Sequence, residues 1–161
     1  MTLKERVLRE SPLVPSTDPE WYAEGLRFSC TQCGNCCTGA PGIVAFSPEE
    51  GDAMANRLDM SVVDFHRRFA RKVNGAWSLT ERKTSFGYDC VFLDRESNPG
   101  VAGCRLYKDR PKQCRTWPFW PENLESPQAW EEAKSNAPCP GMGQGTLVPI
   151  ESIRIQRNDP G

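Results

Sequence analysis

The chain of 161 residues carries a formal net charge of -1 at pH 7, with 38% hydrophobic and 25% charged residues. This length suits one globular domain, and a charge near zero gives no general attraction to nucleic acid or anionic lipid. No apolar run reaches the roughly 18 residues of a membrane-spanning segment, so we expect neither nucleic acid nor a membrane as a partner.

The N-terminal segment, residues 1–25, is expected to be an arm preceding a domain at 26–161. Its mixed charge and its three prolines, Pro12, Pro15 and Pro19, predict a short helix followed by an extended stretch. Residues 1–10 are charged and lack the apolar core of a secretory signal. We therefore expect a cytoplasmic protein in a reducing compartment.

A cysteine knuckle occupies residues 28–39 and has the spacing C-x2-C-x2-C-C. It contains Cys30, Cys33, Cys36 and Cys37. A C-x2-C turn folds the chain back, so that two thiolates can converge on one metal. Gly34 inside the turn permits unusual backbone angles and leaves N–H groups free to point at sulfur. Because successive side chains diverge, we expect Cys36 and Cys37 to face two different metals or two edges of one site.

Capping signals predict two helices after the knuckle. Residues 47–50 read Ser-Pro-Glu-Glu, a capping box with proline at the first helical position, and predict a helix to about residue 58. Residues 61–64 predict a second capping box. The helix that it opens carries Val62, Phe65 and Phe69 on one face, and its other faces carry Arg67, Arg68, Arg71 and Lys72.

The other elements follow from turn and cap residues. The Asn74-Gly75 turn predicts entry into a strand, and Ser126-Pro127 predicts a helix start. Residues 117–121 are rigid and aromatic, and residues 138–145 are expected to be a loop. Strands are expected at 42–46, 76–80, 90–93 and 103–107, and helices at 109–115, 127–135 and 149–156.

The cysteine content is the outlier of the composition. Eight cysteines make up about 5% of the chain, against one histidine, His66. In a reducing compartment so many cysteines indicate metal ligands or redox groups rather than structural disulfides. A nearly all-sulfur site favours four-cysteine zinc or an iron–sulfur cluster. The candidate ligands are Cys30, Cys33, Cys36, Cys37, Cys90, Cys104, Cys114 and Cys139. We therefore expect a small single domain of the α+β class, with short helices and a few short strands around a cysteine-ligated metal centre.

Eight thiolates can form two four-cysteine sites or surround one polynuclear cluster. Bacterial ferredoxins place C-x2-C-x2-C on one cluster with a remote cysteine that precedes proline, as Cys139 precedes Pro140 here. By that analogy one site holds Cys30, Cys33, Cys36 and Cys139, and the other holds Cys37, Cys90, Cys104 and Cys114. Disulfides and a metal-free redox dithiol are the remaining alternatives.

Four strings of residues resemble a known family. They are Phe28-Ser-Cys-Thr-Gln-Cys-Gly-Asn-Cys-Cys, Cys90-Val-Phe-Leu-Asp, Cys104-Arg-Leu-Tyr-Lys-Asp-Arg-Pro-Lys-Gln-Cys-Arg-Thr-Trp-Pro-Phe and Cys139-Pro-Gly. Together they resemble the CxxCxxCC family of YkgJ-type cysteine-cluster proteins, zinc- or iron-chelating domains, over about residues 26–145. The resemblance implies metal chelation by the eight cysteines. A more distant group with a similar cysteine pattern includes flagellin lysine N-methylases, for which this chain is short.

Several neighbouring side chains have two interpretations. Arg110 and Arg115 are expected near the thiolates, where they offset negative charge, rather than in substrate binding. Trp117, Phe119 and Trp120 are expected to form a lid that excludes water from the metal. The following residues are expected to be ordinary surface or loop positions: His66, Arg67, Arg68, Arg71, Lys72 and the glycines of 141–145.

Three functions remain open at this stage. The first is a non-catalytic metal-binding protein, such as a chelator, a metal-delivery factor or an electron carrier. The second is an iron–sulfur enzyme for redox or group-transfer chemistry, such as a distant relative of the lysine N-methylases. The third is a structural metal in a domain that binds a partner protein.

Overall fold

The strands pair only with antiparallel neighbours, in four small sheets. The computed structural model describes residues 19–161, so the predicted N-terminal helix lies outside the described residues. The sheets are β1 (Leu26–Phe28) with β9 (Met142–Val148), β2 (Ala45–Phe46) with β4 (Ala76–Leu79) and β3 (Ala70–Val73), β5 (Glu81–Thr84) with β6 (Gly87–Cys90), and β7 (Leu93–Asp94) with β8 (Gly103–Cys104). With the helices described below they form a small α+β domain, as predicted.

Helix α1 (Pro48–Arg57) begins at the predicted capping box. The backbone N–H of Glu50 donates to the Ser47 hydroxyl at 3.2 Å, and the Glu50 carboxylate accepts from the Ser47 N–H at 2.8 Å. Helix α2 (Val62–Phe69) has half of its predicted box. The Ser61 hydroxyl caps the helix, but the Asp64 carboxylate accepts from that hydroxyl instead of from the Ser61 backbone.

The Asn74-Gly75 turn joins β3 to β4, so the predicted strand at 76–80 is confirmed. Both turn residues have positive φ, 49° at Asn74 and 80° at Gly75, as a two-residue hairpin turn requires. Strand β3 was not predicted, and the expectation that Arg71 and Lys72 belong to the second helix is wrong, because α2 ends at Phe69. The central residues of β3, Arg71 and Lys72, are exposed and charged, so the pairing with β4 defines this strand more than its own composition.

The other helices are α3 (Lys112–Thr116), α4 (Pro127–Asn136) and α5 (Ile150–Asn158). The Ser126 hydroxyl accepts from the Ala129 N–H at 3.0 Å and caps α4 as predicted. The strand predicted at 103–107 is shorter, because β8 is followed by a single 3-10 turn, η2 (Tyr107–Asp109). A second such turn, η3 (Pro121–Leu124), precedes α4. Within residues 19–161, no helix is long and apolar enough to cross a membrane.

Residues 142–148 form strand β9, so the loop predicted for 138–145 is wrong over its second half. The glycines allow close approach to β1: a Cβ on Gly141 would lie 2.1 Å from the Ser29 carbonyl oxygen. A Cβ on Gly145 would lie 2.2 Å from the Ser29 hydroxyl. The glycines therefore indicate a neighbouring backbone in a strand.

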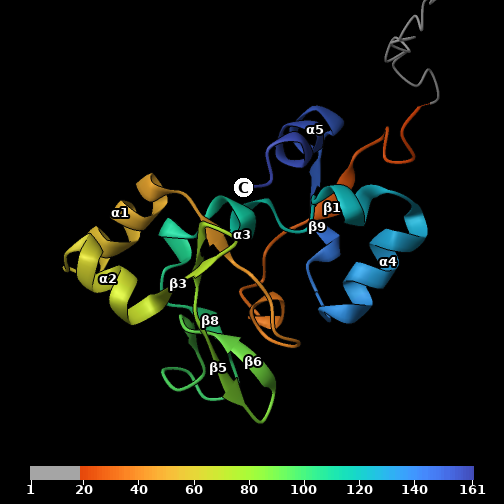
Figure 1. Cartoon of the computed structure of the whole chain (residues 1–161). Helices are drawn as coiled ribbons and strands as arrows, with labels where there is room; N and C mark the ends of the chain where they lie inside the picture. Colours follow the sequence, from red (N-terminus) through yellow and green to blue (C-terminus); the bar gives the residue numbers. More distant parts are fainter. Residues whose placement is uncertain (1–18) are drawn as a thin grey trace, which may run out of the picture.

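The side chains pack into two hydrophobic cores. The α1–α2 core consists of Phe46, Met54, Ala55, Phe65, Leu79, Phe92 and Leu106. The α4–α5 core consists of Tyr22, Phe119, Leu124, Trp130, Ala133, Met142 and Ile153. Tyr22 belongs to the segment expected to be an arm. In Figure 1, α1 and α2 lie on one side of α3, α4 lies on the other, and the β5–β6 hairpin projects away from both.

Candidate metal centre

All eight cysteines line one cavity of about 60 Å³. They are Cys30, Cys33, Cys36, Cys37, Cys90, Cys104, Cys114 and Cys139. Apolar lining comes from both hydrophobic cores, for example Phe28 and Trp117 on one side and Phe92 and Leu106 on the other. The cavity therefore lies where the two cores meet, and each cysteine carries a free thiol.

The knuckle is fixed by a left-handed turn at Gly34, with φ of 75°. A Cβ at this position would lie 2.7 Å from Leu93 Cδ1 and 2.9 Å from the Ala102 Cβ. Both conformation and space therefore require glycine. The turn directs the Asn35 N–H toward the Cys33 sulfur at 3.5 Å, as the sequence predicts.

Cys36 and Cys37 lie in one 3-10 turn, η1 (Asn35–Cys37), with their sulfurs 3.9 Å apart. The expectation that these side chains diverge is wrong, because this turn brings both to the same wall of the cavity. Two thiolates bound to one tetrahedral zinc at about 2.3 Å would lie about 3.8 Å apart. The observed separation of 3.9 Å is close to that distance, so one metal would need little movement of these two sulfurs to bind both.

A buried ion pair anchors the segments that carry Cys37 and Cys90. Asp89 is fully buried and accepts from Arg95 at 2.7 and 3.0 Å. It also accepts from the Thr38 hydroxyl at 2.6 Å. The hydrogen bonds from Arg95 lower the pKa of Asp89 to about 2, so this carboxylate is ionised at neutral pH. Thr38 follows Cys37 and Asp89 precedes Cys90. The hydrogen bond between Thr38 and Asp89 therefore fixes the position of Cys37 relative to Cys90.

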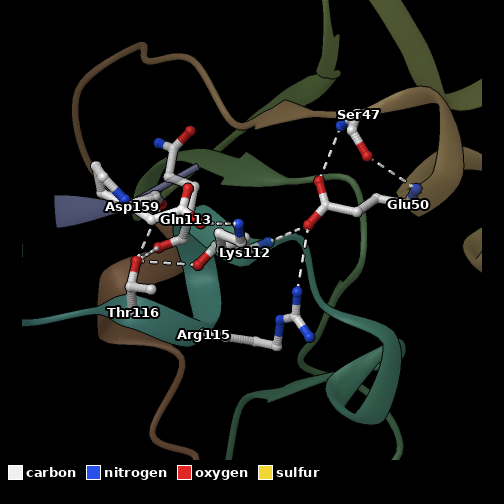
Figure 2. Close-up of polar contacts among 8 residues, drawn as sticks. Ser47, Glu50, Lys112, Gln113, Arg115, Thr116 and Asp159 are labelled. Atoms are coloured by element: carbon white, nitrogen blue, oxygen red, sulfur yellow. Dashed lines mark hydrogen bonds and ion pairs between the residues drawn. The ribbon is translucent and has the colours of Figure 1, made fainter. Parts of the chain in front are cut away.

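Glu50 positions the helix that carries Cys114. Its Oε1 atom accepts from the backbone N–H of Lys112 at 2.6 Å and contacts the Arg115 guanidinium at 3.4 Å (Figure 2). Arg115, predicted to lie near the thiolates, is therefore engaged by α1. The short helix α3 is thus attached to the start of α1, 62 residues away along the chain.

Gln113 attaches α3 to β2 next to Cys114. Its side-chain oxygen accepts from the Ala45 N–H at 2.8 Å, and its NH₂ group donates to the Ile43 carbonyl at 2.8 Å. The side-chain amide of Gln113 therefore makes the two backbone hydrogen bonds that a neighbouring strand would make with residues 43 and 45. Both polar ends of Gln113 are used, so its role is to hold α3 against the sheet.

Cys139 is brought to the knuckle by a contact between remote segments. The Asn35 side chain donates to the Pro138 carbonyl at 2.6 Å, across 103 residues of sequence. The adjacent β1–β9 pairing joins the same two regions, with Leu26 opposite Val148. These contacts place Cys139 on the cavity wall.

Backbone N–H groups point at three of the sulfurs, each from two residues further along the chain. Asn35 donates to Cys33 at 3.5 Å, and the backbone N–H groups of Phe92 and Leu106 oppose the rise that burial causes in the pKa values of Cys90 and Cys104. A hydrogen bond to sulfur favours the thiolate over the thiol. The donors are therefore arranged as a thiolate-bound metal requires.

Burial, in contrast, favours the neutral thiol over the thiolate and therefore raises the cysteine pKa values. It raises the pKa of Cys90 to about 11 and also raises the pKa values of Cys104 and Cys114. For the adjacent pair, the hydrogen bond between the two sulfurs lowers the pKa of Cys36 and raises that of Cys37. Without a cation in contact, most of these groups are neutral thiols at pH 7, and a bound metal would deprotonate them.

Arg110 is the cationic side chain on the cavity wall, as expected for one of the two predicted arginines. Its positive charge opposes the rise that burial causes in the pKa values of Cys104 and Cys114, and it adds to the lowering of the pKa of Cys36 by the Cys37 hydrogen bond. The Arg110 Nε donates to the Tyr107 carbonyl at 2.9 Å, and the guanidinium lies 4.0 Å from the Tyr107 ring centre. This stacking directs the charge to the cavity.

The three aromatic residues expected to form a lid have different positions. Phe119 is 2% exposed and belongs to the α4–α5 core, so its assignment to a lid is wrong. Trp120 donates its indole N–H to the Gln113 carbonyl at 3.0 Å. Trp117 lines the cavity, and its indole Nε1 is buried without a hydrogen-bond partner among the described residues. A group that presents acceptors in the cavity, such as metal-bound sulfur, would satisfy this donor.

Two further residues lie in or near the site. Tyr107 was not predicted to belong to it, and His66 was predicted not to be a ligand. Tyr107 lines the cavity, and the Cys30 thiol raises its pKa through a hydrogen bond. Its only signal was its position between Cys104 and Arg110. His66 is half-buried and packs on Trp77 with ring centres 4.0 Å apart, within the α1–α2 side of the fold, and its Nε2 is buried without a hydrogen-bond partner among the described residues.

The sulfurs surround the cavity without forming a closed site. Among residues 19–161, no three His, Cys, Asp or Glu side chains are already positioned to hold one metal ion. A metal would therefore draw the thiolates inward from the walls of the cavity. Such coupling between site formation and metal binding is common for cysteine sites.

The chain is thus a cysteine-rich α+β domain whose eight thiols share one cavity. Residues 29–140 match the CxxCxxCC family, described as "Putative zinc- or iron-chelating domain". This match covers more than half of the chain, and the protein belongs to that family. No solved structure matches it.

Proposed function

We propose that this protein binds zinc or iron through the thiolates of all eight cysteines. The observation that carries the proposal is that eight cysteines from five separate parts of the chain line one cavity. The donor set contains sulfur alone, which suits zinc and iron–sulfur clusters and disfavours magnesium and calcium. The N–H groups directed at sulfur, the Arg110 charge and the orphan Trp117 N–H all favour bound thiolate.

We further propose that the cysteines form two groups of four. Cys37 lies close enough to Cys36, Cys90 and Cys114 for their charges to raise its pKa, and these four also share the wall of a second cavity. The remaining four are Cys30, Cys33, Cys104 and Cys139. Compared with the ferredoxin analogy, Cys36 and Cys104 exchange places. The 3.9 Å separation of the adjacent sulfurs supports grouping Cys36 with Cys37, and Cys104 is assigned to the other group because it does not line the second cavity.

Bound zinc would hold the domain together and could be delivered elsewhere, whereas an iron–sulfur cluster would supply electron transfer or redox catalysis. The site residues other than cysteine are Arg110, Tyr107 and Trp117, which contribute charge, hydrogen bonds and exclusion of water. They do not form an arrangement of acid, base and nucleophile. We therefore favour a metal-binding role, with an iron–sulfur redox or group-transfer enzyme as the alternative.

Anaerobic purification followed by elemental analysis and visible spectroscopy tests this function. Iron with acid-labile sulfide and a brown colour would assign an iron–sulfur cluster, and colourless protein with zinc would assign a zinc site. The matched control is the Cys90→Ser/Cys114→Ser variant, which should bind less metal per chain. A fully reduced parent protein that binds neither zinc nor iron would overturn the proposal.

A further inference from the structure

A second cavity of about 240 Å³ adjoins the cysteine cavity. The two share Cys36, Cys37, Cys90, Cys114 and Trp117 as lining residues. A volume of 240 Å³ corresponds to about eight water molecules at liquid density, enough for a small organic molecule. A molecule in this second cavity would therefore lie against one group of four thiols.

The neutral polar groups on the wall are mostly committed to the protein. The Thr38 hydroxyl donates to Asp89, and the Gln113 amide is bonded at both ends to residues 43 and 45. Trp120 donates its indole N–H to the Gln113 carbonyl. Because these groups are occupied, Trp120 offers mainly its aromatic ring to a ligand, and Tyr88 adds a second ring.

The charge on this wall is negative. Glu81 lines the cavity with a side chain that is 14% exposed. Its two oxygens accept from the Gly42 N–H at 3.1 and 3.2 Å, and the nearest cation, Arg71, is 3.9 Å away. A carboxylate has about four acceptor positions, so Glu81 keeps capacity for another donor. No lysine or arginine is among the described residues that line the cavity.

We propose that this second cavity binds a small organic ammonium ion. Three aromatic residues, Tyr88, Trp117 and Trp120, line the cavity, and the face of an aromatic ring attracts a cation. The Glu81 carboxylate supplies the opposite charge, and thiolates of the shared wall add to it when metal is bound. An anion would be repelled by the Glu81 carboxylate and would find the Trp117 N–H as its unpartnered donor, and a neutral molecule would leave the Glu81 charge without a counter-ion. This inference adds a ligand class to the proposed metal site and does not depend on which metal is bound.

Choline and 3,3-dimethylbutan-1-ol form a matched pair of probes, because they have nearly the same shape and differ in charge. Calorimetry on protein of measured metal content should show choline binding at least tenfold more tightly than the alcohol. Butyrate should not bind. Indole N–H signals of Trp117 and Trp120 should shift in NMR spectra on addition of choline. Equal affinity for choline and the alcohol, or tighter binding of butyrate, would overturn the proposal.

Two variants locate the binding. Glu81→Gln retains an acceptor for Gly42 but removes the charge, and it should weaken choline binding about tenfold while leaving the binding of the alcohol unchanged. Tyr88→Leu should weaken choline binding without removing the carboxylate. The control is Glu132→Gln, on the exposed face of α4, which should bind choline as the parent does. Unchanged affinity in both cavity variants would contradict the assignment. Metal analysis of the same samples separates this outcome from a failure to bind metal.

Discussion

The carboxylate of Glu50 accepts a hydrogen bond at 2.6 Å from the backbone N–H of Lys112, the first residue of the helix that carries Cys114. The same carboxylate closes the capping box of α1 through the Ser47 N–H. One side chain thus connects the start of α1 with the start of α3 (Figure 2). The position of Cys114 depends on this connection.

Glu50→Ala should lower the free energy of unfolding by about 2 kcal/mol, because it leaves two partly buried N–H donors without acceptors. Urea denaturation measures the change. The control is Glu49→Ala at the neighbouring exposed position of α1, which should cost less than about 0.5 kcal/mol. Equal losses in the two variants would show that Glu50 does not couple the helices.

Asp89→Asn should cost about 3 kcal/mol, since it breaks a buried ion pair and leaves Arg95 without its partner. The comparison is Asp64→Asn, which breaks the exposed pair with Arg67 and should cost less than about 1 kcal/mol. Thermal or urea unfolding of both variants checks the difference. A cost below that of the surface pair would mean that Asp89 does not hold Thr38 and the knuckle in place.

Gly34→Ala combines two penalties. The left-handed backbone costs about 1–2 kcal/mol for any residue with a Cβ, and the crowding against Leu93 and Ala102 adds about 1–3 kcal/mol. Gly75→Ala is the matched control, because Gly75 also has positive φ but has no atom within 4 Å of the added Cβ. The difference in free energy of unfolding between the two variants isolates the packing of the knuckle. Equal costs would contradict the crowded geometry.

Cys36→Ser and Cys37→Ser should each remove the same half of the bound metal, because the two sulfurs are proposed to bind one metal. Cys139→Ser should remove the other half. Measurement of metal per chain in each single variant, and in the Cys36→Ser/Cys37→Ser double variant, checks this. If the double variant loses all the metal while each single variant loses half, the adjacent cysteines serve different sites and the grouping by cavity is incorrect.

Removal of metal by a chelator under reducing conditions should lower the Tm by roughly 20 °C or more. Metal–thiolate bonds at structural sites contribute about 10 kcal/mol, and each kcal/mol shifts the Tm of a domain of this size by about 2–4 °C. Differential scanning calorimetry with and without chelator measures the change, and restored metal should restore the Tm. An identical Tm after verified removal of the metal would show that metal binding does not stabilise the fold.

Local signals predicted the helices well. Ser47, Ser126 and the Asn74-Gly75 turn act through neighbours a few residues away, and the helices and the hairpin begin where these signals place them. Strands β5 and β9 were missed because their stability comes from partners. Residues 81–84 read Glu-Arg-Lys-Thr and are a strand only by pairing with β6. The Gly-rich start of β9 depends on close approach to Ser29.

In the candidate site, too, the features set by local sequence were predicted and those set by distant partners were not. Spacing and residue type predicted the eight cysteines and Arg110, and the structure brings them to one cavity. The orientation of Cys36 and Cys37 depends on the 3-10 turn after Gly34, which the spacing does not reveal. Asp89 and Glu81 are single carboxylates in an ordinary strand pattern. Their roles follow from burial and from partners far away in sequence.

The contact between Asn35 and Pro138, 103 residues apart, also sets when the cysteine cavity can be completed during synthesis. At synthesis rates of about 5–20 residues per second, the knuckle thiols leave the ribosome some 5–20 s before the segment of Cys139 is available. During that interval the early cysteines are unpartnered thiols on an incomplete chain, open to oxidation and to the wrong metal. If the eight cysteines bind metal as proposed, loading can be completed only after the segment that carries Cys139 has left the ribosome.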